Sequence, residues 1–204
     1  LYKTYIGAGW YDSVTPAVIQ RNVFENPVWY TSYTPYQAEI SQGRLEALLN
    51  FQTVVSDLTA MPLANCSLLD EATAAAEAAT MMFGLRSRAQ QKAGADTLFV
   101  DEEVFPQVLA VIRTRAIPQG MKIRTGNYKT LEFTPDIFGC IVQYPNNSGS
   151  VEDYRAFTEQ AHAAGCKVAV DADIMALVLL TPPGEWGADI VFGSTQRLGI
   201  PMFY

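Results

Sequence analysis

The sequence predicts an α/β domain with a mainly parallel sheet flanked by helices. From residue 97 onward, short apolar runs typical of buried strands alternate with segments of helical periodicity. The run 137–145 is almost entirely apolar, as expected for a strand covered on both faces. A chain of 204 residues is long enough for one well-buried core of this kind. We therefore expect one domain, 1–204, in which an aromatic-rich helical segment, 1–60, precedes the sheet.

The first part of the chain predicts two helices. Thr15 followed by Pro16 is a helix-start pair with Thr as the N-cap, so a short helix is expected over 16–25. A loop dense in aromatic residues, 26–37, then leads into a long helix over 38–61. Its apolar residues recur at helical spacing, namely Ile40, Leu45, Leu48, Leu49, Val54, Val55 and Leu58.

The second part predicts the sheet and the helices that cover it. Asp70 can cap an alanine-rich helix over 71–89, whose small side chains suit close packing against a sheet. Another helix is expected over 148–165, with Ser150 as its cap and Gly165 as its end. The expected strands are 97–102, 121–126, 137–145, 166–173 and 188–193, with a helix over 104–116 between the first two.

Composition argues against several classes of function. The net charge of −7 disfavours nucleic-acid binding through bulk electrostatics. Cys66, Cys140 and Cys166 lie far apart, which indicates reduced thiols, and one histidine, His162, leaves too few soft ligands for zinc. The longest apolar run, 174–180, is much shorter than the roughly 20 residues of a membrane span.

Ligands of open parallel sheets lie beyond the carboxyl ends of the strands, and three polar residues are candidates there. Ser67 lies just before the alanine-rich helix, whose first N–H groups can bind a phosphate or simply be capped. Asn146 follows a buried strand and can place an amide over a flat ring or form an ordinary turn. Asp171 ends a hydrophobic strand, so we expect a cationic partner or a ligand donor, unless it only caps the loop.

The turn 193–197 follows the last strand and is the fourth candidate. Turns in this position often hold the reactive group of an α/β enzyme. This one contains no lysine, histidine, cysteine or carboxylate. The residues alone therefore leave open whether the chain is an enzyme, a part of one or a scaffold.

Long stretches of the sequence resemble the glycine decarboxylase P-protein of the glycine cleavage system. The resemblance runs essentially end to end and corresponds to the N-terminal half of a long polypeptide with two homologous halves. It implies the fold of the large domain of fold-type-I pyridoxal-phosphate (aminotransferase-like) enzymes. We expect the chain to be a fragment of that polypeptide. The stretches that carry the resemblance are 15–53, 67–78, 173–197 and "GIPMFY" at 199–204.

The resemblance also implies an activity, that of glycine dehydrogenase (aminomethyl-transferring), an oxidoreductase. Such enzymes bind glycine on pyridoxal phosphate, release carbon dioxide and pass the aminomethyl group to the lipoyl group of the H-protein. The expected partners are the C-terminal half, the H-protein and glycine, in a dimeric assembly. The expected compartment is the bacterial cytoplasm, or the mitochondrial matrix in a eukaryote.

The Schiff-base lysine of the family stands in the C-terminal half, in a turn equivalent to 193–197. Here the candidates for that position are Gln196 or Arg197, and neither can form an aldimine. The resemblance therefore implies that the catalytic lysine comes from the other half and that this fragment alone is inactive. An independent enzyme with an unusual lysine is disfavoured by the missing amine, whereas a non-catalytic scaffold or docking subunit stays an alternative.

Other site residues are carried over from the resemblance. Asp171 stands near the carboxylate that pairs with the pyridine nitrogen, and Asn146 near the asparagine beside the ring oxygen. Without a lysine, both are interpreted mainly as relics that support their loops. Tyr33, Thr34 and Tyr36 could instead reach with their hydroxyls into the working site of the other half, or serve only as interface anchors.

Overall fold

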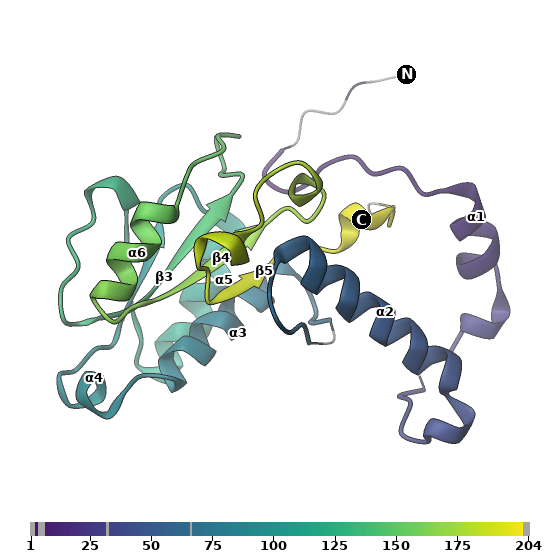
Figure 1. Cartoon of the computed structure of the whole chain (residues 1–204), viewed down its shortest axis with the longest axis horizontal. Helices are drawn as coiled ribbons and strands as arrows, with labels where there is room; N and C mark the ends of the chain where they lie inside the picture. The colour runs from purple at the N-terminus through teal and green to yellow at the C-terminus, as the bar shows by residue number, and fades with distance from the viewer. Residues whose placement is uncertain (1–2, 4–6, 32, 66, 202–204) are drawn as a thin grey trace.

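The computed structural model describes residue 3 and residues 7–31, 33–65 and 67–201, and it consists of a sheet domain and an arm (Figure 1). The arm, residues 17–59, lies to one side of the domain in this view, and its last helix returns toward the sheet. No helix among the described residues is both long and apolar enough to cross a bilayer.

The sheet has five strands in the order β2-β1-β3-β4-β5, and every neighbouring pair is parallel. All eight residues of β3 are buried, as the unbroken apolar run predicted. The expected alternation of strands and helices is therefore confirmed. The strands are β1 Thr97–Asp101, β2 Lys122–Gly126, β3 Ile137–Tyr144, β4 Lys167–Ala172 and β5 Ile190–Phe192.

Helices cover both faces of the sheet. Helices α3 (Glu71–Gly84) and α5 (Pro106–Ala116) pack on one face, where Leu98 and Ile141 are fully buried. Helix α6 (Arg155–Ala163) packs on the other face, over Phe99 and other alternate strand residues. This alternation along the strands produces two hydrophobic cores, one on each side of the sheet.

The alanine-rich helix begins where the sequence predicted but ends earlier. Asp70 accepts the N–H of Thr73 at 2.7 Å, and the Thr73 hydroxyl accepts the N–H of Asp70, which completes a capping box. The helix ends at Gly84, and a separate short helix, α4 (Arg88–Lys92), follows, so one helix over 71–89 is wrong. The glycine of β3 allows α3 a close approach, since a Cβ at Gly139 would lie 2.9 Å from the sulfur of Met82.

The helix expected over 148–165 begins seven residues late. Ser150 is not its cap, because its backbone N–H donates to Asn146 Oδ1 and holds it in the preceding loop. Asp153 Oδ1 instead accepts the N–H of Arg155, the first helical residue. The end is as predicted, with Gly165 in the left-handed region at φ +77°.

The arm departs from the prediction at two positions. Thr15 does not cap the first helix, because its hydroxyl donates to Gly199 O at 2.6 Å. The expected helix 16–25 is a short α1 (Ala17–Ile19) that continues as a π-helical turn, Gln20–Phe24. The long helix is α2 (Gln42–Thr59), and its expected first residues form a separate 3₁₀ turn, Ala38–Ile40. The other 3₁₀ turns are Pro27–Trp29, Ile117–Gln119, Tyr128–Thr130, Ala176–Val178, Pro183–Trp186 and Gln196–Leu198.

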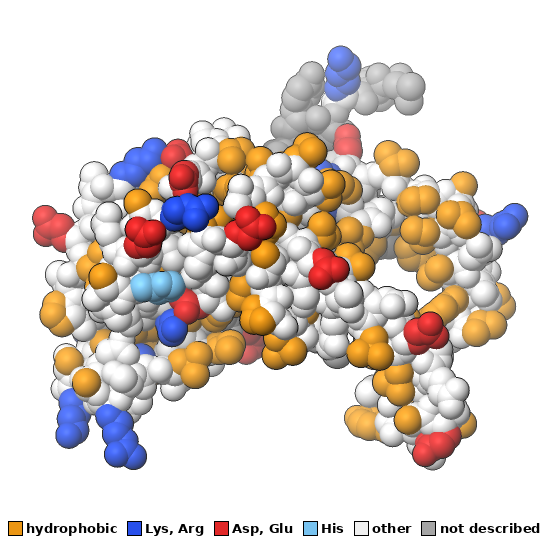
Figure 2. Space-filling view, viewed as in Figure 1, with side chains coloured by type: hydrophobic (Ala, Val, Ile, Leu, Met, Phe, Trp, Pro, Cys, Tyr) orange, Lys and Arg blue, Asp and Glu red, His pale blue; other side chains and the backbone are white. Residues whose placement is uncertain are grey.

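Large apolar side chains lie exposed along the arm, and Figure 2 shows hydrophobic side chains gathered over this part of the molecule. The end of α2 nevertheless packs closely on the sheet domain, because a Cβ at Gly184 would lie 2.1 Å from Ala60 O. The exposed residues of the arm include Val18, Ile19, Val23, Phe24, Val28, Trp29, Tyr30, Tyr33, Tyr36, Ile40, Leu49 and Val54.

Candidate functional site

Asp171 lies near the carboxyl end of β4, an inner strand, at the edge of the sheet where ligands of such folds bind. It pairs in register with Gln143 of β3 and Phe192 of β5, and its exposure is 0%. Neither of its carboxylate oxygens accepts a bond from an N–H or hydroxyl donor of the described residues. The cationic partner expected for Asp171 is therefore not found within the described chain.

The neighbour of Asp171 is another carboxyl group, Glu71, the first residue of α3. Burial raises the pKa of Asp171 well above its usual range, and the charge of Glu71 raises it further. Burial also raises the pKa of Glu71. A buried and a half-buried carboxylate side by side without a cation are costly, so one proton held by the pair satisfies both groups best. Sequence reasoning missed Glu71, because nothing in the sequence pairs the start of α3 with the end of β4.

Arg197 is directed at another carboxylate. Its Nε lies 3.2 Å from Asp173 Oδ1, and both side chains are mostly buried. Its Nη1 donates to the carbonyl of Asp12, and its guanidinium lies 5.2 Å from the ring centre of Tyr11. The positive charge at this turn is thus paired with Asp173 and does not reach Asp171 as a hydrogen-bond donor.

Gln196 is engaged as fully as Arg197. Its Nε2 donates to Ile200 O at 2.7 Å and to Ser13 Oγ at 3.2 Å. The two residues that stand where the resemblance places a lysine therefore hold neighbouring segments of this chain. The backbone itself is close here, since a Cβ at Gly193 would lie 2.1 Å from Ala172 O.

The hollow between these groups is too small for a cofactor. It leaves about 10 Å³ for the centre of a water-sized molecule, which is room for about one water. Sites for cofactors usually occupy some 300–1,000 Å³. Glu71, Asp173 and Arg197 line it, and because Asp173 and Arg197 are paired with each other, no free positive charge is left for a phosphate. The residues present here do not fit pyridoxal phosphate.

The lysines of the chain lie away from this hollow. Lys122 and Lys167 begin β2 and β4, at the opposite edge of the sheet, and Lys92 ends α4. Lys129 is paired with Glu152 at 3.0 Å. Lys3 is exposed.

The other two sequence candidates of the sheet domain do not line the hollow. Asn146 is buried, and its Oδ1 accepts the Ser148 hydroxyl at 2.9 Å and the Ser150 N–H at 2.8 Å. It closes its own loop, which favours the turn over an amide placed on a ring. Ser67 is exposed, three residues before the capping Asp70.

The three arm candidates are exposed and contact mainly their own loop. Tyr36 is 85% exposed, and Tyr33 and Thr34 are also exposed. The Tyr33 hydroxyl accepts the N–H of Gln37 at 3.3 Å. Within the described residues these side chains do not meet the hollow, so any role in a site needs another part of the protein.

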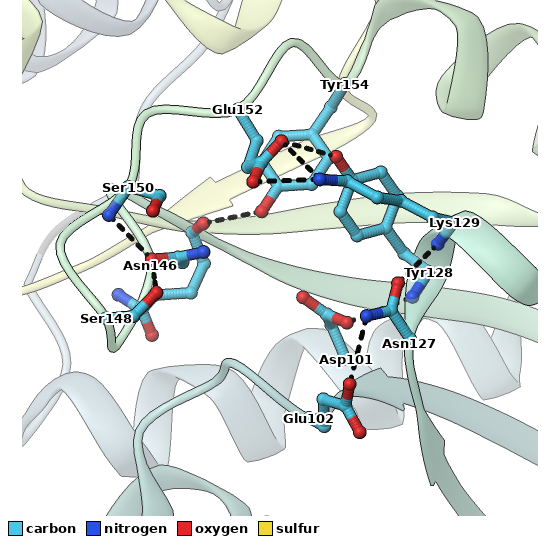
Figure 3. A network of polar contacts seen from close by, with 11 residues as sticks. Asp101, Glu102, Asn127, Tyr128, Lys129, Asn146, Ser148, Ser150, Glu152 and Tyr154 are labelled. Carbon is cyan, nitrogen blue, oxygen red and sulfur yellow. Dashed lines mark hydrogen bonds and ion pairs between the residues drawn. The ribbon is translucent and has the colours of Figure 1, made fainter.

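A second buried carboxyl group, Asp101, ends β1 at the same edge of the sheet (Figure 3). Only 1% of it is exposed, and Oδ1 accepts the N–H of Tyr128 at 3.1 Å. Oδ2 has no hydrogen-bond partner in the part of the chain that the structure describes. Burial raises the pKa of Asp101 to about 6. Its sequence signal matches that of Asp171, an acidic residue at the end of an apolar strand.

A polar network surrounds Asp101 and joins the loops that follow β1, β2 and β3 (Figure 3). Glu102 accepts the side-chain amide of Asn127 at 3.0 Å. Glu152 accepts the hydroxyl of Tyr128 at 2.9 Å and is paired with Lys129. Apart from Asp101 Oδ2, these groups are paired with one another and hold the loops together.

Polar groups elsewhere are also paired. His162 Nε2 lies 2.8 Å from Asp189 Oδ2, and Lys167 Nζ lies 2.8 Å from Oδ1 of the same carboxylate. Among the residues placed by the structure, no group of three or more metal-ligating side chains is arranged to hold an ion. Cys140 and Cys166 are free and buried, and Cys66 lies outside the described residues.

Comparison with curated proteins gives relatives along the whole chain. The family described as glycine cleavage system P-protein matches residues 1–204. The glycine dehydrogenase (decarboxylating) of Bacteroides fragilis is 77% identical over 204 residues, and that of Flavobacterium johnsoniae is 54% identical over 204. Both alignments cover 100% of this chain but only 22% of the relative. The chain thus spans about a fifth of the length of these relatives.

Comparison with solved structures gives the same result. A crystal structure of glycine decarboxylase (P-protein) of the glycine cleavage system, in inhibitor-bound form, matches with a TM-score of 0.87 and 35% identity, covering 98% of this chain and 45% of that one. DndA from Streptomyces lividans (TM-score 0.59, 14% identity, 97% and 57% covered) shares the fold alone. So does the methionine gamma lyase CalE6 from Micromonospora echinospora (TM-score 0.58, 21% identity, 73% and 39% covered). The expected fold class is confirmed, and the chain belongs to the glycine cleavage system P-protein family.

Proposed function

We propose that this chain is the part of a glycine dehydrogenase (decarboxylating) that lacks the Schiff-base lysine and completes an active centre carried by the rest of the protein. The observation that carries the proposal is the turn after β5, which has no lysine and whose Gln196 and Arg197, the residues that the resemblance puts at the lysine position, bind neighbouring segments. The match of the whole chain to a fifth of named glycine dehydrogenases supports it.

The cofactor of the complete enzyme is pyridoxal phosphate, bound covalently by the other half. When bound, it supplies the electron sink for decarboxylation. The carboxylates and the small size of the hollow support a location outside residues 1–204. Glycine and the lipoyl group of the H-protein are the other reactants of the complete enzyme, in the cytoplasm of a bacterium.

The contribution of this chain is the arm. Large apolar side chains exposed in this number are typical of surfaces that another protein part covers. The relatives are between four and five times as long as this chain, so their remaining length includes a part that can cover the arm in a dimeric assembly. Tyr33, Thr34 and Tyr36 then lend a hydroxyl to the working site or anchor the interface.

The alternative is a non-catalytic scaffold or docking subunit of the same complex. The exposed arm fits this function equally well, because a docking surface needs no hydroxyl at a reacting atom. The two functions differ in one respect, since only the first makes the activity of the complete enzyme depend on the three hydroxyls.

Borohydride reduction of the full-length protein with pyridoxal phosphate tests the proposal. After peptide mapping, we expect stoichiometric pyridoxyl label on one lysine outside residues 1–204. Protein reduced without added cofactor is the control for carried-over label. Stoichiometric label on any of Lys3, Lys92, Lys122, Lys129 or Lys167 would refute the proposal.

A further inference from the structure

The segment that connects the N-terminus to the arm lies across the turn after β5. We call residues 9–16 the linking segment. The Ser13 hydroxyl donates to Ile200 O at 2.7 Å, and the Thr15 hydroxyl donates to Gly199 O at 2.6 Å. These bonds join residues more than 180 positions apart in the chain. The place where the arm leaves the domain is therefore fixed by this turn.

The backbones of the two segments are in close contact. Gly199 has φ +102°, and a Cβ there would lie 3.1 Å from Pro16 Cδ and 3.2 Å from Val14 O. A side chain at this position would push the linking segment away. The contact therefore depends on the glycine as well as on the hydroxyls.

The side-chain amide of Gln196 binds both segments of this contact. Its Nε2 donates to Ser13 Oγ at 3.2 Å and to Ile200 O at 2.7 Å. The Ile200 carbonyl thus accepts from both the Gln196 amide and the Ser13 hydroxyl, and the Ser13 hydroxyl in turn accepts from the same amide. All three groups are at least partly buried, so water competes weakly for them.

Arg197 makes the second attachment. Its guanidinium is held by Asp173 at 3.2 Å, donates to the carbonyl of Asp12 and lies over the ring of Tyr11 at 5.2 Å. A planar guanidinium can make these three contacts at once, whereas an ammonium cannot. Two successive residues of the linking segment are therefore attached to a side chain that is itself anchored to the sheet domain.

We propose that Gln196 and Arg197 are positioning residues that fix the point at which the arm leaves the sheet domain. In this chain the turn that would carry a reactive amine serves to hold the linking segment. Without the two side chains, the arm keeps its helices, but the linking segment is no longer held in one position on the sheet domain. Only the consequence for activity rests on the proposed function, because the anchoring itself involves residues of this chain alone.

The test measures the distance between two spin labels in the full-length protein. Labels are introduced as noncanonical amino acids at Val14, which is 86% exposed, and at Arg113, an exposed residue of α5. We expect one narrow distance distribution in the parent protein. Gln196→Ala combined with Arg197→Met should at least double its width.

Two further variants make the test specific. Arg88→Met removes an exposed arginine of α4 and should leave the distribution unchanged. Arg197→Lys keeps a charge near Asp173 but loses the planar donor group, and it should broaden the distribution by less than Arg197→Met does. Removing Arg197 leaves the mostly buried Asp173 without its cation and should lower the melting temperature. Distances are therefore measured well below the lowest melting temperature of the series, which separates displacement of the linking segment from unfolding of the sheet domain.

An unchanged distribution in the double variant would overturn the proposal, as would equal broadening in Arg88→Met. Activity is measured in parallel as glycine–bicarbonate exchange with H-protein. Broadening with normal exchange supports the anchor and counts against the catalytic role proposed for the arm. Lost exchange with an unchanged distribution contradicts the anchor and leaves the proposed function intact.

Discussion

Asp101→Asn is expected to remove the pH-dependent loss of stability that the buried Asp101 carboxylate causes in the sheet domain. In the folded chain burial raises the pKa of this carboxyl group from 3.8 to about 6. The native state therefore binds more protons than the unfolded state between about pH 4 and pH 6, and the free energy of unfolding falls as the pH rises through this window. This loss of stability is absent below the pKa of Asp101 in the unfolded chain and complete above about pH 6.

The size of the effect follows from the shift. A rise of about two pKa units corresponds to about 3 kcal/mol, since each unit is worth about 1.4 kcal/mol. The asparagine retains an oxygen that can accept the N–H of Tyr128, so the contact to that loop survives. The difference in stability between variant and parent should therefore shift by up to about 3 kcal/mol in favour of the variant between pH 4 and pH 7.

Amide hydrogen exchange of residues 139–144 in β3 measures the effect, after correction for the intrinsic pH dependence of exchange. These amides lie in the strand next to β1 and report opening of the sheet. Glu159→Gln is the matched control, because Glu159 is an exposed carboxylate of α6 outside the network around Asp101, and this variant should give the pH dependence of the parent. Parallel pH profiles for the parent and Asp101→Asn would refute the reasoning.

Two further predictions concern the arm and the turn after β5. In the full-length enzyme, at least one of Tyr33→Phe, Thr34→Val and Tyr36→Phe should lower the rate of glycine–bicarbonate exchange tenfold or more at unchanged melting temperature. A tenfold lower rate corresponds to about 1.4 kcal/mol of lost transition-state stabilisation. Near-normal exchange in all three variants would leave these residues as interface anchors. Gly193→Ala should destabilise the sheet domain by about 3 kcal/mol or more, because its Cβ would lie 2.1 Å from Ala172 O. Gly43→Ala, with nothing within 4 Å of its Cβ in α2, should be neutral or stabilising in the same thermal unfolding assay; equal melting temperatures for the two variants would show that the close approach at Gly193 is wrong.

The sheet was predictable from the sequence because its signals are local. The predicted ends of each strand agree with the structure to within about two residues, because each strand is a short apolar run and each helix has its own periodicity in the sequence. The cap at Asp70 was predictable for the same reason, as its partner Thr73 is three residues away. Gly165 ended its helix as expected because a left-handed residue is needed there.

The errors come from side-chain partners that residue type does not reveal, two of them distant in the chain and one, Asn146 for Ser150, only four positions away. Thr15 has the chemistry of a cap, but Gly199 takes its hydroxyl. Ser150 failed as a cap because Asn146 holds its N–H in the loop. The pair of Glu71 and Asp171 joins residues 100 positions apart, so composition and spacing contain no signal for it. The sequence therefore predicted that Asp171 ends its strand at the carboxyl edge of the sheet, but it did not predict the neighbouring Glu71.

The central claim is that the hollow beyond β4 and β5 is closed to the cofactor and lacks its lysine. The most direct test places an amine on the turn beside the hollow, by making Gln196→Lys and Arg197→Lys separately in the full-length protein. Each variant is incubated with pyridoxal phosphate, reduced with borohydride and mapped by mass spectrometry. We predict no pyridoxyl label at position 196 or 197, because the hollow leaves only about 10 Å³ for the centre of a water-sized molecule and carries the carboxylates of Glu71 and Asp173. Stoichiometric label at either position would contradict the claim.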